Sequence, residues 1–343
     1  MAQHLYEATH IVIGNLPPRT QEVMLRRFGI AKGKRETLES VGRSYDITRE
    51  RVRQIESFAL KQLRDAGDAS ELAPYISKLE EFMRSRGGVM AEHHVLAHFA
   101  TTCLHDDTKH PHVQGCVLLL LNVGPQFDRQ RGTDDVHPHW VVDKQKVAFM
   151  HEVLEAIRTH LVHKQSVQQL AHIVDAIEHD LYPDIVDAYI NVSKYIGKNQ
   201  FDHYGLSDWP EITPKGMRDK AYLVLKHVKK PLHFTAVATS INEMGLSKRP
   251  ALSQTVHNEL IKDPRFVLVG RGMYALSEWG YQPGTVKDVI VDVLKQGGKP
   301  LTREEILKTV LTKRHVKPNT ILLNLHNRKE FKRTGDGRYA LAS

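Results

Sequence analysis

Residues 37–64 read TLESVGRSYDITRERVRQIESFALKQLR. Their pattern predicts the fold of the N-terminal part of the chain. Thr37 and Thr48 are each placed to cap a helix, because a threonine hydroxyl accepts a hydrogen bond from the amide groups that a helix start leaves unpaired. Gly42 lies between them, where the absence of a side chain permits close packing beside a turn. The spacing therefore predicts a short helix, a tight turn and a longer helix.

The longer helix has two predicted faces. Val52, Ile55 and Ala59 recur at helical spacing and predict a buried face. The other face carries polar and charged residues, namely Arg49, Glu50, Arg53, Gln54 and Ser57. Arginine can pair with guanine, glutamine with adenine, and glutamate can accept from cytosine. A solvated charged helix would carry similar residues, but the whole spacing from Leu16 to Leu63 favours a helix-turn-helix that reads DNA.

The residues before this motif predict one more helix. The run Leu16-Pro17-Pro18 ends a segment, and residues 19–28 follow with apolar side chains for a core. Gly29 and Gly33 then punctuate a loop.

Residues 12–66 resemble, almost residue for residue, region 4 of the bacterial sigma-70 factors. In that family the motif reads the −35 promoter element and docks on RNA polymerase. The resemblance implies base contacts by Arg49, Glu50 and Gln54. It implies DNA backbone contacts by Arg19, Arg27, Thr37, Leu38, Arg51 and Arg53. Phe58 stands where the family usually has lysine, so either a phosphate contact is lost there or Phe58 packs against the next domain.

The composition sets broad limits. A length of 343 residues predicts about two to four domains. No apolar run approaches about 18 residues, so no membrane span is expected, and no export signal is seen. Cys103 and Cys116 are the only cysteines and give no disulfide framework. We therefore expect a cytoplasmic protein, and the resemblance to a bacterial sigma-factor region implies association with the nucleoid.

The net charge of +8 is unevenly distributed. Residues 19–64 contain twelve Lys and Arg against six Asp and Glu, and residues 299–338 contain eleven against four. Residues 68–211 contain twelve against twenty-one. The basic ends would attract phosphate and the acidic middle would be repelled by it, although an ordinary solvated surface also fits the middle.

Two stretches near the C-terminus repeat one another. Residues 255–276 and 320–341 align without a gap, 65 positions apart, and Lys-Pro-Leu precedes each. Each predicts helices followed by a hairpin with a Gly-x-Gly turn, which is the pattern of a winged helix-turn-helix. In each hairpin a phenylalanine precedes a tyrosine by eight residues, and we expect these rings to close the sheet onto the helices.

A similar pair of aromatic residues recurs twice upstream, as a weaker match to this pattern. Phe201 precedes Trp209 by eight residues, and Phe127 precedes Trp140. We therefore predict a mainly α fold with small β-hairpins, in which the N-terminal helix-turn-helix is followed by tandem winged-helix domains. The predicted domains are residues 1–67, 70–143, 144–212, 213–282 and 283–343. The alternative is a single helical domain over residues 70–212.

The domain at residues 213–282 also resembles the HARE-HTH family, which includes a domain of the RNA polymerase delta subunit. The match lies in Ala221 to Leu225, in Pro231 to Phe234 and in the hairpin from Arg265 to Leu276. This resemblance implies that the domain acts as an adaptor that binds DNA or another protein.

Exposed polar residues of the last two modules are candidates for additional DNA contacts. In the last module these are Lys317, Asn319, Thr320, Asn324, Lys332, Arg333 and Arg338. The equivalent positions of the third module are Ser253, Gln254, His257 and Asn258, with Lys262, Arg265 and Arg271 nearby.

No constellation for catalysis is found, so we do not expect an enzyme and expect no cofactor. The chain has no Walker loop, zincin motif or nucleophile elbow. Its best metal-ligand cluster lacks the paired spacing of a structural zinc site, and no metal is expected. That cluster comprises Cys103, His105, His110, His112 and Cys116.

The sequence thus predicts a transcription factor that binds double-stranded promoter DNA and the β flap of core RNA polymerase, and we expect a monomer. The alternative is a DNA-binding adaptor or specificity subunit of a restriction or chromosome-organising system. The chain shows no segment like the promoter-melting region of sigma factors, so we expect it to act beside a sigma factor, to replace the −35 contact of one, or to compete for its docking site.

Overall fold

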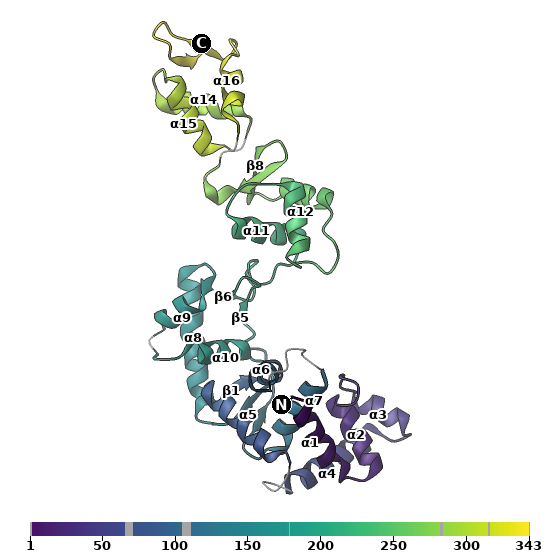
Figure 1. Cartoon of the computed structure of the whole chain (residues 1–343). Coiled ribbons are helices and arrows are strands. Elements are labelled where there is room, and N and C mark those ends of the chain that lie inside the picture. The colour runs from purple at the N-terminus through teal and green to yellow at the C-terminus, as the bar shows by residue number, and fades with distance from the viewer. Residues whose placement is uncertain are drawn as a thin grey trace. The chain divides into compact units, whose positions relative to one another are not determined.

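The computed structural model describes residues 2–65, 71–104, 111–177, 179–281, 284–314 and 316–342. The described chain is mainly helical with small antiparallel sheets (Figure 1), which confirms the predicted fold class at that level. It divides into two compact units, Met1–Asp208 and Trp209–Ser343. Among the described helices, none is both long and apolar enough to cross a membrane.

The first unit begins with four helices: α1 (Ala2–Gly14), α2 (Pro18–Phe28), α3 (Leu38–Ser44) and α4 (Arg49–Asp65). Pro18 opens α2, at a position where its missing N–H would be unpaired in any case. Gly29 ends the helix with a φ of +75°, a left-handed conformation that glycine adopts without strain. Helices α3 and α4 form the predicted two-helix motif.

Two blocks with the same order of elements follow in the first unit. The first comprises α5 (Ala73–Ser85), β1 (Val89–Ala91), α6 (Glu92–Leu104), α7 (Pro111–Val123), β2 (Asp128–Gln130) and β3 (His139–Val141). The second comprises α8 (Lys146–Lys164), β4 (Gln168–Gln169), α9 (Leu170–Ala176), α10 (Pro183–Val192), β5 (Ile196–Lys198) and β6 (His203–Leu206). In both, the last strand lies between the other two and is antiparallel to them.

The second unit repeats this order. Its first block comprises α11 (Met217–Val228), β7 (Leu232–His233), α12 (Phe234–Glu243), α13 (Ser253–Lys262), β8 (Phe266–Gly270) and β9 (Met273–Leu276). Its second block comprises α14 (Val286–Gly297), α15 (Arg303–Lys313), α16 (Pro318–Leu325), β10 (Phe331–Arg333) and β11 (Tyr339–Leu341). In the second block a single bridge between Leu301 and Tyr339 takes the place of the first strand.

The paired rings of the second unit lie where the sequence predicts. Phe266 and Tyr274 are buried in one core with side chains of α11, α12 and α13. Phe331 is buried with side chains of α14, α15 and α16, and Tyr339 packs at the edge of that core. These rings therefore hold each hairpin against its helices.

The markers expected for the hairpin of residues 196–206 are wrong. Phe201 lies in the turn between β5 and β6, and Trp209 lies beyond β6 in the other unit. Ile196 begins β5 as Phe266 begins β8, and Tyr204 follows Ile196 by eight residues; both are buried. The spacing is retained, but isoleucine takes the place of phenylalanine, so a search for aromatic pairs misses it.

The N-terminal helices and the block that follows them share one core. Side chains of α1, α2 and α4 lie with side chains of α5, α6 and α7 in a single buried cluster. Helix α7 lies so close to α2 that a Cβ added at Gly115 would be only 2.6 Å from the carbonyl oxygen of Phe28. The domain boundary expected between residues 67 and 70 lies outside the described residues, and the core is continuous across it.

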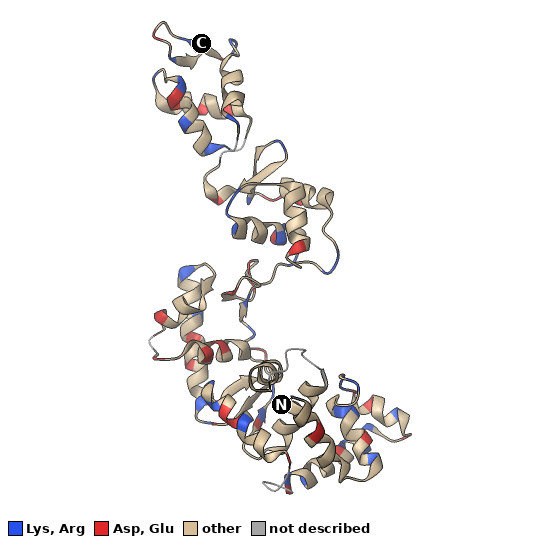
Figure 2. Cartoon of the chain, in the orientation of Figure 1, with Lys and Arg blue, Asp and Glu red and all other residues tan. Residues whose placement is uncertain are grey.

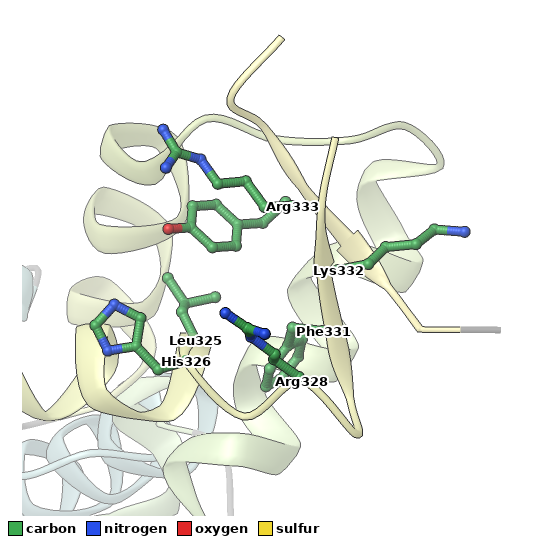
Figure 3. Close-up of a pocket in the computed structure, with 7 residues that line it drawn as sticks. Leu325, His326, Arg328, Phe331, Lys332 and Arg333 are labelled. Atoms are coloured by element: carbon green, nitrogen blue, oxygen red, sulfur yellow. The ribbon is translucent and has the colours of Figure 1, made fainter. Parts of the chain in front are cut away.

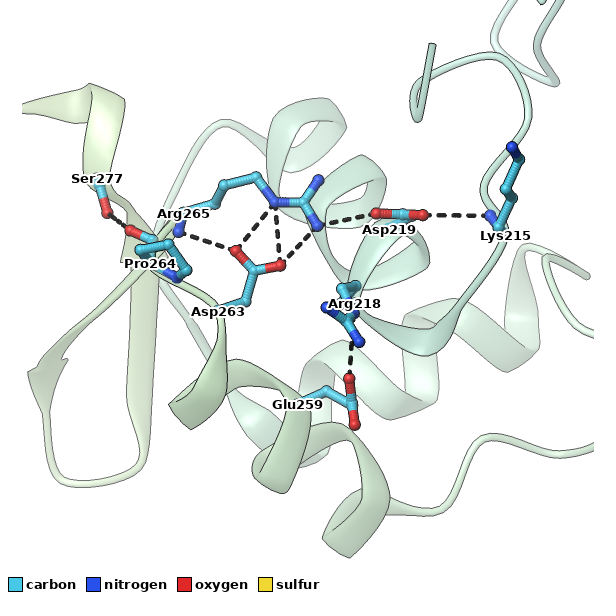
Figure 4. Close-up of polar contacts among 8 residues, drawn as sticks. All are labelled: Lys215, Arg218, Asp219, Glu259, Asp263, Pro264, Arg265 and Ser277. Carbon is cyan, nitrogen blue, oxygen red and sulfur yellow. Dashed lines mark hydrogen bonds and ion pairs between the residues drawn. The ribbon is translucent and has the colours of Figure 1, made fainter. Parts of the chain in front are cut away.

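Arg265 connects the corner between α13 and β8 to α11 (Figure 4). Its guanidinium donates to both carboxylate oxygens of Asp263 and, at 2.8 Å, to Asp219. The hydrogen bond to Asp263 raises the pKa of Arg265 and lowers the pKa of Asp263. Arg265, which the sequence places near a DNA-facing surface, is instead engaged inside its own block.

Candidate nucleic-acid interface

The turn between α3 and α4 is fixed by two caps and a glycine. The Thr37 hydroxyl accepts from an N–H in the first turn of α3 at 3.1 Å, and the Thr48 hydroxyl accepts from one in the first turn of α4 at 3.2 Å. A Cβ added at Gly42 would lie 2.6 Å from the carbonyl oxygen of Ile47. Both predicted caps are confirmed, and the close approach of the two helices requires glycine at position 42.

Helix α4 has one buried and one exposed face. Val52 and Ala59 are fully buried and Ile55 is half-buried, which confirms the predicted core side. The exposed side carries Arg49, Glu50, Arg51, Arg53 and Gln54, and we call these five residues the reading face. A helix of this kind, with guanidinium, carboxylate and amide groups free to point outward, has the chemistry that base edges in the major groove require.

Side chains of the reading face pair with one another. Arg53 donates to both carboxylate oxygens of Glu50, at 2.7 and 2.9 Å, and Arg51 donates to the Gln54 carbonyl at 3.1 Å. The hydrogen bond from Arg53 lowers the pKa of Glu50, so this carboxylate stays ionised. Exposed pairs of this type add little to stability, so exchanging them for DNA partners costs little.

Two arginines of α2, both predicted to contact the DNA backbone, have different surroundings. Arg19 is exposed, with its guanidinium 5.0 Å from the centre of the Tyr45 ring. Arg27 is largely buried, and it donates to Glu56 of α4 at 2.7 Å and to the carbonyl of Glu36. Its guanidinium is therefore paired within the motif, where it positions α4.

The two residues at the start of α3 that are predicted to contact the DNA backbone differ in exposure. Thr37 is exposed and Leu38 is half-buried, packed beside Val23, Val41 and Val52. Because Leu38 is the first residue of α3, its N–H is one of the groups a helix start leaves unpaired. Phe58 is 56% exposed, so more than half of its surface faces solvent.

Arg26 also holds the motif together, although no sequence pattern points to it. This residue donates to both oxygens of Glu36, at 2.9 and 2.7 Å, and to the Ser44 hydroxyl at 2.7 Å. The hydrogen bond from Arg26 lowers the pKa of Glu36 to about 2. These contacts connect α2 to the residues before α3 and to its last turn. No periodicity in the sequence relates Arg26 to Glu36, because a loop separates them.

Polar contacts fix the motif to the block that follows. His112 Nδ1 lies 2.7 Å from the Ile30 carbonyl oxygen, and Arg64 donates to the Asn122 carbonyl at 2.8 Å. Together with the shared core, these contacts hold α4 and the end of α2 against α7.

In the last block the predicted DNA-contacting residues lie on α16 and the hairpin. Most are exposed, namely Lys317, Asn319, Thr320, Lys332, Arg333 and Arg338, whereas Asn324 is half-buried. Asn324 donates to the Thr320 carbonyl at 2.8 Å, and Arg338 pairs with Asp336 at 3.2 Å. Figure 2 shows Lys and Arg in blue in this block and in α2 to α4, with Asp and Glu in red among them.

In the block from α11 to β9, several of the candidate DNA-contacting residues already contact other side chains of the block. His257 stacks on Phe234 with ring centres 4.4 Å apart, and Gln254 donates to Asn258 at 3.3 Å. These side chains are therefore partly engaged within their own block.

The cysteine and histidine cluster does not form a metal site within the described residues. His105 and His110 lie outside those residues. In the ranges that the structure covers, no group of three or more His, Cys, Asp or Glu side chains could hold a metal ion. Burial raises the pKa of the Cys116 thiol to about 11, as expected for an inert core cysteine.

The geometry of α3 and α4 is that of a helix-turn-helix of the DNA-binding class. The family "Sigma-70, region 4" matches residues 12–65. The RNA polymerase sigma factor RpoD of Neisseria gonorrhoeae is 42% identical over 76 residues, which are 22% of this chain and 12% of that protein. The RNA polymerase sigma factor SigA of Clostridium acetobutylicum is 42% identical over 65 residues, which are 19% of this chain and 17% of that protein. The similarity thus covers less than a fifth of these relatives.

Proposed function

We propose that this chain is a DNA-binding transcription factor that acts with bacterial RNA polymerase. Its helix-turn-helix would contact −35-type promoter DNA, the polymerase flap, or both. The observation that carries this proposal is the exposed reading face of α4, which lies inside the segment that matches sigma-70 region 4.

Different residues of this domain would contact the bases and the backbone of DNA. Arg49, Glu50 and Gln54 would contact base edges, because their forked or paired polar atoms suit guanine, cytosine and adenine. The backbone contacts would come from Arg19, Thr37, Leu38, Arg51 and Arg53. Phosphate contacts set the position of the helix on the duplex, and base contacts set the sequence preference.

We further propose that the four blocks behind this domain are winged-helix domains, with residues 213–282 of the HARE-HTH type. The support is their common order of elements and the central position of the last strand in each three-stranded sheet. Their role would be to extend the contact along DNA or along polymerase. The acidic excess over residues 68–211 favours a protein partner for that part. A monomer would suffice for a long footprint.

The DNA contact is tested by selecting preferred duplexes with the whole protein and measuring the affinity of variants. We expect Arg49→Ala and Gln54→Ala each to weaken binding to the selected site by about 1–3 kcal/mol and to relax the preference at one base pair. Arg84→Ala is the matched control, because it removes an exposed arginine of α5 that pairs with Glu80. Unchanged sequence preference in the two α4 variants would refute base reading.

The polymerase contact is tested by capturing purified core polymerase on the immobilised protein. We expect a stable complex in the absence of DNA. Absence of a complex, with DNA binding retained, would overturn the polymerase role and leave a DNA-binding adaptor outside transcription.

A further inference from the structure

The last block contains an open pocket of about 640 Å³ between the end of α16 and the hairpin of β10 and β11 (Figure 3). Its floor is apolar, because Leu325 and Phe331 line it and are 3% and 2% exposed. Tyr339 of β11 also lines it and presents a half-buried ring. The pocket therefore offers a flat aromatic surface above an apolar base.

Cationic side chains surround this apolar floor. Arg333 is paired directly with Tyr339 in the sheet register, so both side chains lie on the same face. Arg328 and His326 also line the pocket and are exposed, and Figure 3 shows both beside Leu325. The nearby carboxylates are engaged elsewhere: Glu330 pairs with Lys287 at 2.9 Å and Asp336 with Arg338 at 3.2 Å. In the described part of the chain, Arg328 and Arg333 thus keep their charge available for an anion.

A flat ring, an apolar floor and free guanidinium groups together indicate the chemical class of ligand that the pocket can bind. A bare phosphate needs no apolar floor, and the phosphates of a duplex stand on its outside with their bases stacked away from the protein. A nucleotide in a single strand presents both a phosphate and an unstacked base, which aromatic side chains bind by stacking. We propose that this pocket binds a nucleotide of single-stranded DNA or RNA, with its base on Tyr339 and its phosphate at Arg333 and Arg328.

This site goes beyond the proposed reading of duplex DNA, which belongs to α4 in the other unit. Its test is fluorescence anisotropy of the whole protein with labelled oligonucleotides of about 12 nucleotides, as single-stranded DNA, single-stranded RNA and duplex DNA. The variants are Tyr339→Leu, which keeps apolar bulk but removes the ring, Tyr339→Phe, which keeps the ring, and Arg333→Ala. Arg303→Ala is the matched control, because Arg303 is an exposed arginine of α15 outside the pocket.

We expect Tyr339→Leu and Arg333→Ala to weaken single-strand binding roughly 5- to 100-fold. Tyr339→Phe and Arg303→Ala should stay within about twofold of the unchanged protein. A strand carrying 5-bromouracil should crosslink on irradiation to the segment from α16 to β11. The ratio between DNA and RNA affinity identifies which strand the pocket prefers, and either preference agrees with the proposal.

Two results would overturn it. One is single-strand binding that is unaffected by Tyr339→Leu and Arg333→Ala, or reduced equally by Arg303→Ala. The other is a duplex preference with the same dependence on Arg333, which would make the surface a contact for duplex phosphates. Arg333 is exposed and outside the core, so its variant remains informative if Tyr339→Leu disturbs the fold. Duplex preference is measured separately on Arg49→Ala and Gln54→Ala, so failure of this site and failure of duplex reading are distinguishable.

Discussion

At the scale of single residues, Gly42 decides whether α3 and α4 can meet at the angle that exposes the reading face. The carbonyl oxygen of Ile47 would lie only 2.6 Å from a Cβ at this position. That oxygen belongs to the backbone of the turn, so it cannot move aside as the end of a flexible side chain could.

We therefore expect Gly42→Ala to destabilise the motif by about 1–3 kcal/mol, the usual cost of forcing extra atoms into a packed site. The measurement is hydrogen exchange of the α3 and α4 amides in the whole protein, with duplex affinity as a second readout. Gly14→Ala is the matched control, because a Cβ there meets nothing within 4 Å. Equal exchange rates in the two variants would contradict the assigned role of Gly42.

At the scale of elements, a histidine pair lies where α6 meets α10. His94 is 5% exposed, its ring is stacked on His98 with centres 4.1 Å apart, and its Nε2 lies 3.9 Å from Asp187 of α10. Asp187 also accepts from the Tyr204 hydroxyl at 2.6 Å. Burial lowers the pKa of His94 to about 4 despite the nearby carboxylate, and burial also lowers the pKa of His98. Both rings are therefore neutral in the folded protein near pH 7.

This arrangement predicts a loss of stability on acidification. In the unfolded chain histidine has a pKa of about 6.5, so as the pH falls the unfolded state binds its proton before the folded state does. The stabilising contribution of His94 is complete above about pH 6.5 and is lost as the pH falls towards 4. We expect the first unit to lose on the order of 1–2 kcal/mol between pH 7 and pH 5 from this residue.

The measurement is chemical unfolding of the whole protein at several pH values, followed in the first unit by hydrogen exchange of α6 and α10. His94→Asn should reduce the pH dependence between 7 and 5, and His4→Asn, at an exposed histidine of α1, is the control substitution. A pH dependence that is the same with and without His94 would show that other groups cause it.

At the scale of the whole molecule, the helix-turn-helix is not built as a detached domain. Helix α4 and the two helices before the motif, α1 and α2, contribute Leu5, Ile13, Phe28, Ala59 and Leu63 to the same buried cluster as α5 to α7. Removing the rest of the first unit would expose this apolar surface to water, and surfaces of that kind promote association or loss of structure.

We therefore expect a fragment of residues 1–65 to be less helical by circular dichroism than the same segment within residues 1–208, and to self-associate in ultracentrifugation. Residues 1–208 should remain folded and keep duplex binding. A fragment of residues 1–65 that is monomeric, fully helical and equally tight in DNA binding would contradict the dependence on α7.

The features that local rules govern could be predicted from the sequence alone. The caps at Thr37 and Thr48, the glycine at position 42 and the two faces of α4 follow from spacing within one or two helical turns, and all lie as predicted. The resemblance to region 4 also rests on this continuous stretch. Only the tertiary structure decided that Arg27 and Arg265 pair inside the fold and that α7 shares the core of the first helices. Those contacts join residues far apart in the chain, and no local period relates such residues, because packing in three dimensions selects them.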